Sequence, residues 1–310
     1  MSIKFHLPNY MDKFSGSLNL SIAMMLKNNP ELFYDKTAIG SVYDSFPVKW
    51  NGGQIIAGYI EKGVLDRNVT HLVTRFNQAG IPCRHTFINS VLEEDDLSDY
   101  HCRRILDLTD NGLNQTEVLM PELEERIRGI RPNMPLVSSS LKGLTDYESI
   151  CCELEKDYKY VCLDYRVSRN FELLEKLPHK EKCIITVNNA CDPNCDRHCE
   201  HYEFISKFQR NNCNPQAVEA IRSGWIKLPQ WNCPLTRQTA FTRRQSELHI
   251  TPEEIFGKYK DMGFENFSLE GRGGNSVDLA EQYVYYMVKP EFRDAVRYSL
   301  LVPMINAAKG

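Results

Sequence analysis

The residues best suited to metal chemistry lie in one short segment, 187–202, with the sequence VNNACDPNCDRHCEHY. Three cysteines stand four positions apart there, beginning with Cys191 and Cys195, and Pro, Asn and Asp separate them. Thiolates at such spacing on a turn-forming loop bind iron–sulfur clusters or zinc. We therefore predict that Cys191 and Cys195 bind one metal centre. Zinc with His198 or His201 as a further ligand is the alternative to an iron–sulfur cluster.

The other cysteines divide into two groups. Cys199 closes the same segment, and Cys213 and Cys233 follow in the stretch 209–246, which has no clear periodicity. Long ordered loops are usually functional, and a bound metal would supply ordering energy that such a loop lacks. The remaining cysteines fall inside predicted helices or strands and are interpreted as small buried residues: Cys83, Cys102, Cys151, Cys152, Cys162 and Cys183.

Two acidic residues are each followed two positions later by an arginine, just after a predicted strand. These pairs are Asp164 with Arg166 and Glu270 with Arg272. Charges at a strand end are costly unless they are paired or used. An arginine there suits a carboxylate-bearing ligand through bidentate hydrogen bonds. We predict that the four residues are catalytic, with Arg272 binding an anionic group and Glu270 orienting it or moving a proton.

Other polar residues follow the predicted strands and form a candidate substrate-binding set. Each also has an ordinary interpretation as a helix cap or surface group. The set is Asp44, Thr86, Asn89, Ser139 and Asn188. The turn 50–53, Trp-Asn-Gly-Gly, is placed where it could cover the same site.

Strand-like and helix-like runs alternate along most of the chain, which indicates a parallel sheet. About eight units over roughly 270 residues favour a closed (β/α)8 TIM-type barrel over an open doubly wound sheet. No GxGxxG follows the first strand, so a dinucleotide site has no support. The predicted strands are Ile39–Phe46, Cys83–Ile88, Glu117–Met120, Leu136–Ser139, Tyr160–Tyr165, Cys183–Val187, Trp225–Leu228 and Phe264–Leu269.

The organisation predicted from this pattern is one barrel domain, 39–310, preceded by an N-terminal helical extension, 1–38. An irregular cysteine-bearing insertion, 188–246, follows the sixth predicted strand. The C-terminal ends of barrel strands carry the active sites of such folds. The metal segment and the strand-end charges should therefore face one cavity.

Composition is that of an ordinary globular protein. The chain has 310 residues, 42% hydrophobic and 25% charged, with a formal net charge of −4. Mild acidity argues against a strongly basic nucleic-acid clamp, although a local basic groove stays compatible with it. No run of 18 apolar residues and no signal pattern occurs, so we expect no membrane partner and a cytoplasmic location. In that reducing compartment the 11 cysteines are unlikely to form a disulfide framework.

Two stretches resemble the collagenase-like, or U-thirty-two, peptidase family. The first runs from Asn188 through Cys195 to His201-Tyr202. The second is 251–272, TPEEIFGKYKDMGFENFSLEGR, with the tyrosine-bearing helix that follows. The resemblance spans roughly residues 80 to 290 in order and spacing. Two features depart from the family: Ser268 stands where a lysine is usual, and the signature Gly-x-x-Cys and Ser-Gly-x-Cys block is missing.

The resemblance implies a (β/α) barrel that often holds a [4Fe-4S] cluster on four cysteines. It assigns Cys191, Cys195 and Cys233 as ligands, with Cys213 or Cys199 as the fourth, and it matches Glu270-Gly271-Arg272 to the end of the last strand. Several members are linked to oxygen-independent hydroxylation of RNA bases or quinone precursors, with prephenate as oxygen donor.

The predicted function is therefore an iron–sulfur enzyme with redox or hydroxylation chemistry on a small or modified substrate, with an anionic co-substrate. A peptidase or other hydrolase is one alternative, although no HExxH or GxSxG motif supports it. A non-catalytic binding protein stabilised by zinc or a cluster is the other. Nucleic acid as a partner and a homodimer both stay open.

Overall fold

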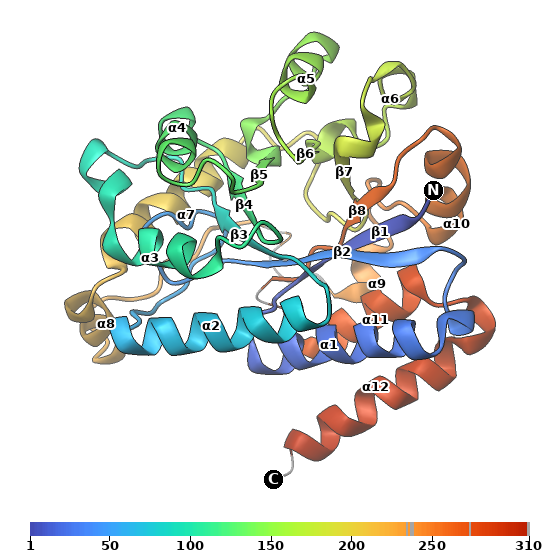
Figure 1. The fold of residues 1–310 in the computed structure, drawn as a ribbon, viewed down its shortest axis with the longest axis horizontal. Helices are drawn as coiled ribbons and strands as arrows, with labels where there is room; N and C mark the ends of the chain where they lie inside the picture. Colours follow the sequence, from blue (N-terminus) through green and yellow to red (C-terminus); the bar gives the residue numbers. More distant parts are fainter. Residues whose placement is uncertain (234, 236–238, 273, 309–310) are drawn as a thin grey trace.

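A computed structural model describes residues 1–233, 235, 239–272 and 274–308 of the chain. Eight parallel strands form a closed barrel, in which each strand pairs with the next and β8 pairs back with β1 (Figure 1). The predicted TIM-type barrel is confirmed. The strands are β1 (Ile3–Pro8), β2 (Thr37–Asp44), β3 (Cys83–Phe87), β4 (Gln115–Val118), β5 (Leu136–Ser138), β6 (Tyr160–Cys162), β7 (Cys183–Thr186) and β8 (Asn266–Ser268).

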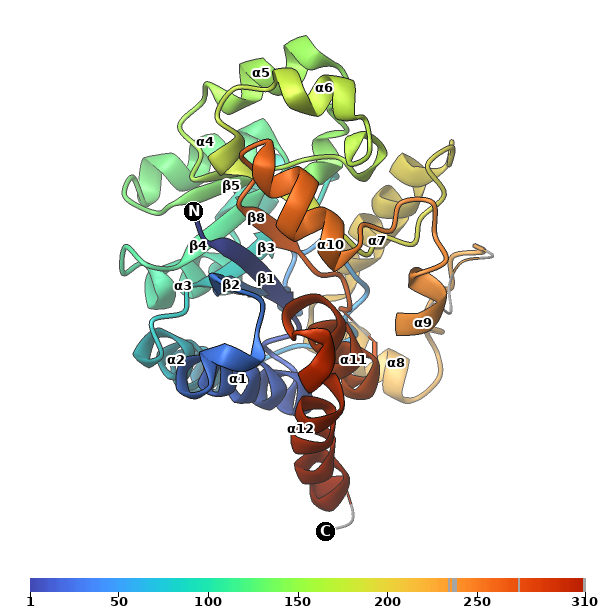
Figure 2. The ribbon, with the colours of Figure 1, turned by 90° about the vertical axis from the view of Figure 1, so that its right-hand side faces the viewer.

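Helices surround the barrel, and α12 extends away from it towards the C-terminus (Figure 2). Those between the first seven strands are α1 (Lys13–Asn28), α2 (Lys62–Gln78), α3 (Tyr100–Thr109), α4 (Pro121–Ile130), α5 (Tyr147–Leu154) and α6 (Phe171–Lys176). Those after β7 are α7 (His198–Asn212), α8 (Pro215–Arg222), α9 (Ala240–Arg243), α10 (Pro252–Glu254), α11 (Ser276–Met287) and α12 (Arg293–Ala308). Helix α10 continues into a π-helical turn, Ile255–Tyr259.

Short polar side chains fix where several helices begin. Asp12 accepts hydrogen bonds from the backbone N–H groups of Phe14 and Ser15 at the start of α1. Thr251 and Glu254 form a reciprocal capping box at α10, as their three-residue spacing predicts. Asn275 caps α11 in the turn that follows β8. These caps satisfy backbone donors that the first helical turn leaves free.

The N-terminal segment differs from the sequence expectation, because residues 3–8 are the first barrel strand. Strand β1 pairs with β2 on one side and β8 on the other, so residues 1–38 belong to the barrel. Ile3, Phe5 and Leu7 are fully buried in the core, and His6 alternates with them on the other face. This period-two pattern of a buried strand was hidden by the presence of an inward-facing lysine and histidine.

The insertion also sits one strand later than expected. It follows β7, because β1 raises the count by one, and it contains α7, α8 and α9. The predicted strand Trp225–Leu228 is not a strand, and the Trp225 side chain is 88% exposed. The barrel still has eight strands, because β1 takes the place of the predicted strand Trp225–Leu228 in the count. Strand β7 pairs directly with β8.

The interior of the barrel is unusually polar. His6 on β1, Arg84 on β3, Gln115 on β4 and Asn266 on β8 are all at most 1% exposed. Branched apolar residues fill this space in most barrels of this type. The apolar core lies instead between the strands and the surrounding helices.

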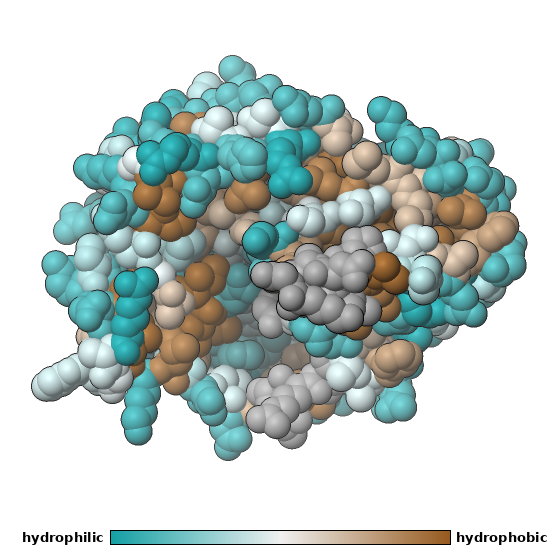
Figure 3. Space-filling view, turned by 90° about the horizontal axis from the view of Figure 1, so that it is seen from below, coloured by the Kyte–Doolittle hydropathy of each residue, from teal (hydrophilic) through white to brown (hydrophobic). Residues whose placement is uncertain are grey.

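On the face seen from below, apolar side chains form separate patches among polar ones (Figure 3). Exposed large hydrophobic residues on the helices of this side include Met24 on α1 and Tyr298 on α12, at 62% and 72% exposure. Among the described residues, no helix combines the length and apolar character needed to cross a membrane.

Candidate functional site

A cavity of about 190 Å³ opens at the C-terminal ends of the barrel strands. Active sites of this fold lie at that end. Its walls combine residues from the strand ends with residues from the loop after β2 and from the insertion. They include Tyr43, Gly53, Arg84, Glu117, Ser139, Tyr202, Arg243, Glu270 and Arg272.

Arg272 is the cation of this cavity that lacks an acidic partner. Its Nη1 donates hydrogen bonds to the hydroxyls of Ser45 and Thr86, both at 3.0 Å. Its guanidinium also lies over the Tyr43 ring, 5.4 Å from the ring centre. No carboxylate of the described residues forms an ion pair with it within 4.0 Å. The positive charge of Arg272 is therefore available to an anion.

Arg84 lies on the same aromatic ring. Its guanidinium is 4.8 Å from the centre of the Tyr43 ring, and its Nε is 3.5 Å from a carboxylate oxygen of Glu117. The Tyr43 hydroxyl donates to the backbone oxygen of Leu269 at 2.7 Å. Burial raises the pKa of Tyr43 to about 12, so its ring stays neutral at physiological pH. Tyr43 thus holds two guanidinium groups at the floor of the cavity.

Glu270 is fixed by the insertion. Its carboxylate accepts a hydrogen bond from Asn189 at 2.9 Å and forms an ion pair with Arg243 at 3.2 Å. Asn188 anchors the same residue through its backbone, because it bonds both the N–H and the carbonyl oxygen of Glu270. Asn188 therefore positions Glu270 and does not itself line the cavity.

The loop after β2 forms a roof over Arg272, as the turn at 50–53 suggested. A Cβ added at Gly53 would lie 2.7 Å from Nη1 of Arg272, so a larger residue there would displace the guanidinium from its present position. Gln209 on α7 holds the loop in place. It accepts from the N–H of Ile56 at 2.9 Å and donates to the oxygen of Ile56 at 3.2 Å.

Asp44 lies behind this wall of the cavity. Its carboxylate accepts from the backbone N–H groups of Met11 and Ser45, and the side chain is 3% exposed. Burial raises the pKa of Asp44 to about 6, although these two bonds and the charge of Arg272 act in the opposite direction. Asp44 shapes the surroundings of Arg272 and does not line the cavity.

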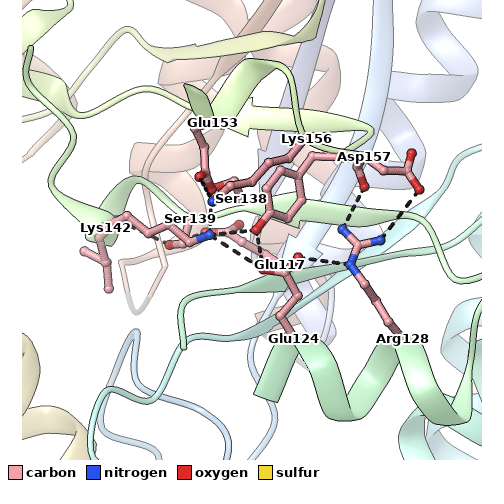
Figure 4. A network of polar contacts seen from close by, with 11 residues as sticks. Glu117, Glu124, Arg128, Ser138, Ser139, Lys142, Glu153, Lys156 and Asp157 are labelled. Atoms are coloured by element: carbon pink, nitrogen blue, oxygen red, sulfur yellow. Dashed lines mark hydrogen bonds and ion pairs between the residues drawn. The ribbon is translucent and has the colours of Figure 1, made fainter. Parts of the chain in front are cut away.

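Ser139 connects the cavity to a dense ionic network outside the barrel (Figure 4). Its hydroxyl donates to Glu117 at 2.9 Å, whereas the neighbouring Ser138 donates to the buried Glu153 at 2.5 Å. Glu153 also accepts from Lys142 and Lys156, both at 2.6 Å. Burial alone would raise the pKa of Glu153, but these three bonds lower it to about 2. Because Glu153 is paired with both Lys142 and Lys156, this network stabilises the wall of the cavity.

Of the predicted catalytic and substrate-binding residues, Ser139, Glu270 and Arg272 line the cavity, whereas six lie outside its lining. These six are Asp44, Thr86, Asn89, Asp164, Arg166 and Asn188. Asp164 and Arg166 form a bidentate ion pair with each other, at 2.7 and 2.8 Å. Asn89 is buried and its amide donates to the backbone oxygens of Lys49, Asn51 and Ser206. Asn89 therefore ties the roof loop to α7.

The predicted metal ligands occupy more than one place. Cys191 lies near Cys195, Tyr165 and Glu270, and burial raises the pKa of its thiol. Cys213 instead accepts a hydrogen bond from Gln209 at 2.8 Å, and burial raises its pKa to about 12.

The charged groups that act on Cys213 are Asp99 and Lys49, whereas those that act on Cys191 are Cys195 and Glu270. Cys199 is exposed and Cys233 is partly buried. Across the residues that the structure describes, no three His, Cys, Asp or Glu side chains are arranged to hold a metal. The four-cysteine set implied by the family resemblance is therefore not assembled in the described chain. Cys191 and Cys195 do interact electrostatically with each other.

Sequence reasoning missed several residues of the cavity. Arg84 and Glu117 were not predicted as site residues because both lie inside strands, whereas the predicted residues follow strand ends. A charged residue at alternate positions of a buried strand was the signal that could have found them. Tyr43, Tyr202 and Arg243 carried no comparable signal, because only the fold brings them to the cavity.

Comparison with known proteins yields a structural similarity. No protein-family model and no curated protein sequence matches the chain. A solved structure of the U32 peptidase Mk0906 is similar over 87% of this chain and 93% of its own, with a TM-score of 0.50 and 14% identity. At that identity the similarity concerns the fold, and it agrees with the resemblance drawn from the two sequence stretches.

Proposed function

We propose that the barrel mouth binds a small anionic substrate through Arg272, with Glu270 and Glu117 available to hold or move a proton. The observation that carries this proposal is the set of contacts that the Arg272 guanidinium makes. It is placed by two hydroxyls and an aromatic ring, and no carboxylate of the described chain pairs with it. The neighbouring Arg84 and Arg243 are each paired with a glutamate.

The side chains that line the cavity indicate which class of substrate it would bind. A guanidinium beside two hydroxyls matches a carboxylate or a phosphate, because each offers several acceptor oxygens. The cavity of about 190 Å³ is small beside the roughly 300–1,000 Å³ of drug-sized pockets, which favours a small molecule over a peptide chain. The peptidase activity in the name of the structural neighbour therefore has no specific observation in its favour here.

The proposal is tested by calorimetric titration with phosphate and with malonate, using neutral malonamide as the uncharged counterpart. We expect the wild-type protein to bind an anion and Arg272→Gln to weaken this binding about 100-fold, the effect of losing a charged partner. The melting temperature should change little. Arg166→Gln is the matched control and should bind like wild type. Unaltered anion affinity in Arg272→Gln, with a large fall in melting temperature, would show that Arg272 is structural.

We further propose that Cys191 and Cys195 share one metal centre, iron–sulfur or zinc, at the rim of this cavity. Their proximity to each other and to Glu270 supports it. A cluster there would supply electron-transfer chemistry, the redox role predicted from the sequence. Because the other cysteines do not converge with them, no reaction step is assigned to it. Iron and zinc analysis of anaerobically purified Cys191→Ala and Cys195→Ala decides the matter, and unchanged metal content in both variants would refute it.

A further inference from the structure

Four buried polar side chains lie inside the barrel, below the anion cavity, and several of their hydrogen-bonding atoms have no partner among the described residues. All four residues are at most 1% exposed. The atoms are His6 Nε2, Arg84 Nε, Gln115 Nε2, Gln115 Oε1 and Asn266 Oδ1. Buried polar atoms are almost always hydrogen-bonded in native proteins, so a cluster of five demands a physical explanation.

Strand register shows that these side chains share one region. Arg84 stands opposite Gln115 across the β3–β4 pair, so both point to the same face of the sheet. His6 stands opposite Ser268 on β8, two positions beyond Asn266. Burial lowers the pKa of the His6 imidazole, whereas hydrogen bonding to the Asn266 side chain acts in the opposite direction. The four side chains therefore share the interior face of the barrel, with His6 beside Asn266.

The His6 ring is held so that one nitrogen remains free. Its Nδ1 is hydrogen-bonded to the hydroxyl of Ser41 at 2.8 Å, and its ring meets the edge of Tyr160 at 5.4 Å between ring centres. A Cβ added at Gly40 would lie 2.7 Å from His6 Cε1, so the glycine makes room for the imidazole. With Nδ1 bonded to Ser41, Nε2 makes no hydrogen bond of normal geometry in the described chain and is the nitrogen that remains for Asn266 or for a water molecule.

The mixture of atoms identifies the chemistry that fits the space. Arg84 Nε and Gln115 Nε2 donate hydrogen bonds, whereas Gln115 Oε1 and Asn266 Oδ1 accept them. A cation would satisfy only the acceptors and an anion only the donors. Water does both, and buried waters typically make about three bonds to such groups. Left dry, each unpaired group would cost roughly 1–3 kcal/mol.

We propose that this interior holds ordered water molecules, bound by His6, Arg84, Gln115 and Asn266, which form a hydrated chamber beneath the anion cavity. Arg84 Nε forms an ion pair with Glu117 at 3.5 Å but no hydrogen bond, so a water molecule there would bridge it to the Glu117 carboxylate and hold the guanidinium against Tyr43. The chamber meets the anion cavity at Arg84, which lines that cavity, and makes this residue a preorganised part of the cavity floor.

The first test is a crystal structure of the wild-type protein at a resolution that shows waters. We expect ordered water within hydrogen-bond distance of Gln115 and of at least one of the other three residues. Well-defined side chains with no water density between them would overturn the proposal. This measurement does not depend on any variant folding and is unaffected if the anion proposal fails.

The second test uses the sign of a stability change. Gln115→Met removes two of the five unpaired atoms at similar volume. In a hydrated chamber it strips hydrogen bonds from the waters, and the melting temperature should fall by several degrees. In a dry interior it removes an unsatisfied amide, and the melting temperature should rise.

The matched control is Thr116→Val. Thr116 lies next to Gln115 on β4, and its buried hydroxyl also lacks a partner in the described chain. It faces the opposite side of the strand, away from the chamber, so the melting temperature should be unchanged or higher. A rise in both variants would contradict the hydrated chamber.

Discussion

Two strand ends of this barrel carry the same short pattern, an acidic residue followed two positions later by an arginine, and they have opposite outcomes. At the end of β6, Asp164 and Arg166 pair with each other. At the end of β8, Glu270 pairs with Arg243, and Arg272 turns to hydroxyls and an aromatic ring. Arg166 is therefore neutralised by its own segment, whereas Arg272 forms no ion pair with a carboxylate of the described chain.

The local backbone explains the difference. Residues Tyr165–Val167 form a 3₁₀ turn, and Asp164 caps it by accepting from the N–H of Arg166, which brings the two side chains together. After β8, Arg272 lies in a turn in which the N–H of Gly274 donates to the oxygen of Gly271 at 3.1 Å, and α11 begins at Ser276. Glu270 and Arg272 therefore diverge to different walls. An acidic residue two positions before an arginine therefore predicts an ion pair only where the backbone between them forms a helical turn.

The largest expected effect concerns Asp44, the buried carboxyl beside Arg272. Its folded pKa of about 6 exceeds the unfolded value of 3.8, so it favours the folded state below about pH 4, and this contribution is lost as pH rises through 6. The difference amounts to about 3 kcal/mol. Denaturant unfolding from pH 4.5 to 8 should show wild type losing stability relative to Asp44→Asn. A pH-independent difference between the two proteins would contradict this assignment.

The next effect separates the two arginines. Asp164→Ala removes the cap of the 3₁₀ turn and the partner of a one-third exposed arginine, so it should lower stability by about 2 kcal/mol. Anion affinity should stay within about twofold of wild type, because neither residue lines the cavity. Urea unfolding and calorimetry measure the two quantities. A loss of anion binding would show that Asp164 and Arg166 belong to the site after all.

A smaller effect is expected from a single methyl group in the roof. Gly53→Ala places a Cβ against the Arg272 guanidinium and should displace it, weakening anion binding about tenfold, or roughly 1.4 kcal/mol. Gly129→Ala is the control, because a Cβ there meets nothing within 4 Å and lies within α4. That change should raise stability by about 0.5–1 kcal/mol and leave binding intact. Equal affinities in the two variants would remove the roof from the site.

The smallest effect tests whether Glu270 repels the ligand. Glu270→Gln keeps an oxygen for Asn189 but removes a negative charge from the cavity. Because the side chain is 36% exposed, screening limits the gain, and anion affinity should rise only about two- to fivefold. The gain should shrink as salt is added. Weaker anion binding would instead mean that Glu270 contacts the ligand as a hydrogen-bond acceptor.

Much of the fold could be predicted because periodic patterns report local structure directly. The three-residue spacing of Thr251 and Glu254 is typical of a capping box, and the structure contains one there. The first strand was missed because its inward residues are Lys4 and His6, which look like a solvent-facing pattern. The prediction of a strand at Trp225–Leu228 was wrong, because a short apolar run does not show by itself whether the segment is a strand or is buried.

The pattern of alternating strands and helices was sufficient to predict the closed barrel and to place Arg272 just after its last strand. Which charged side chains form ion pairs depends on the folded chain. Arg166 and Arg272 differ in their partners, and those partners are set by turn geometry and by residues more than 180 positions away, Ser45 and Thr86. Electrostatic pairing depends on distance in space, and sequence separation does not report it.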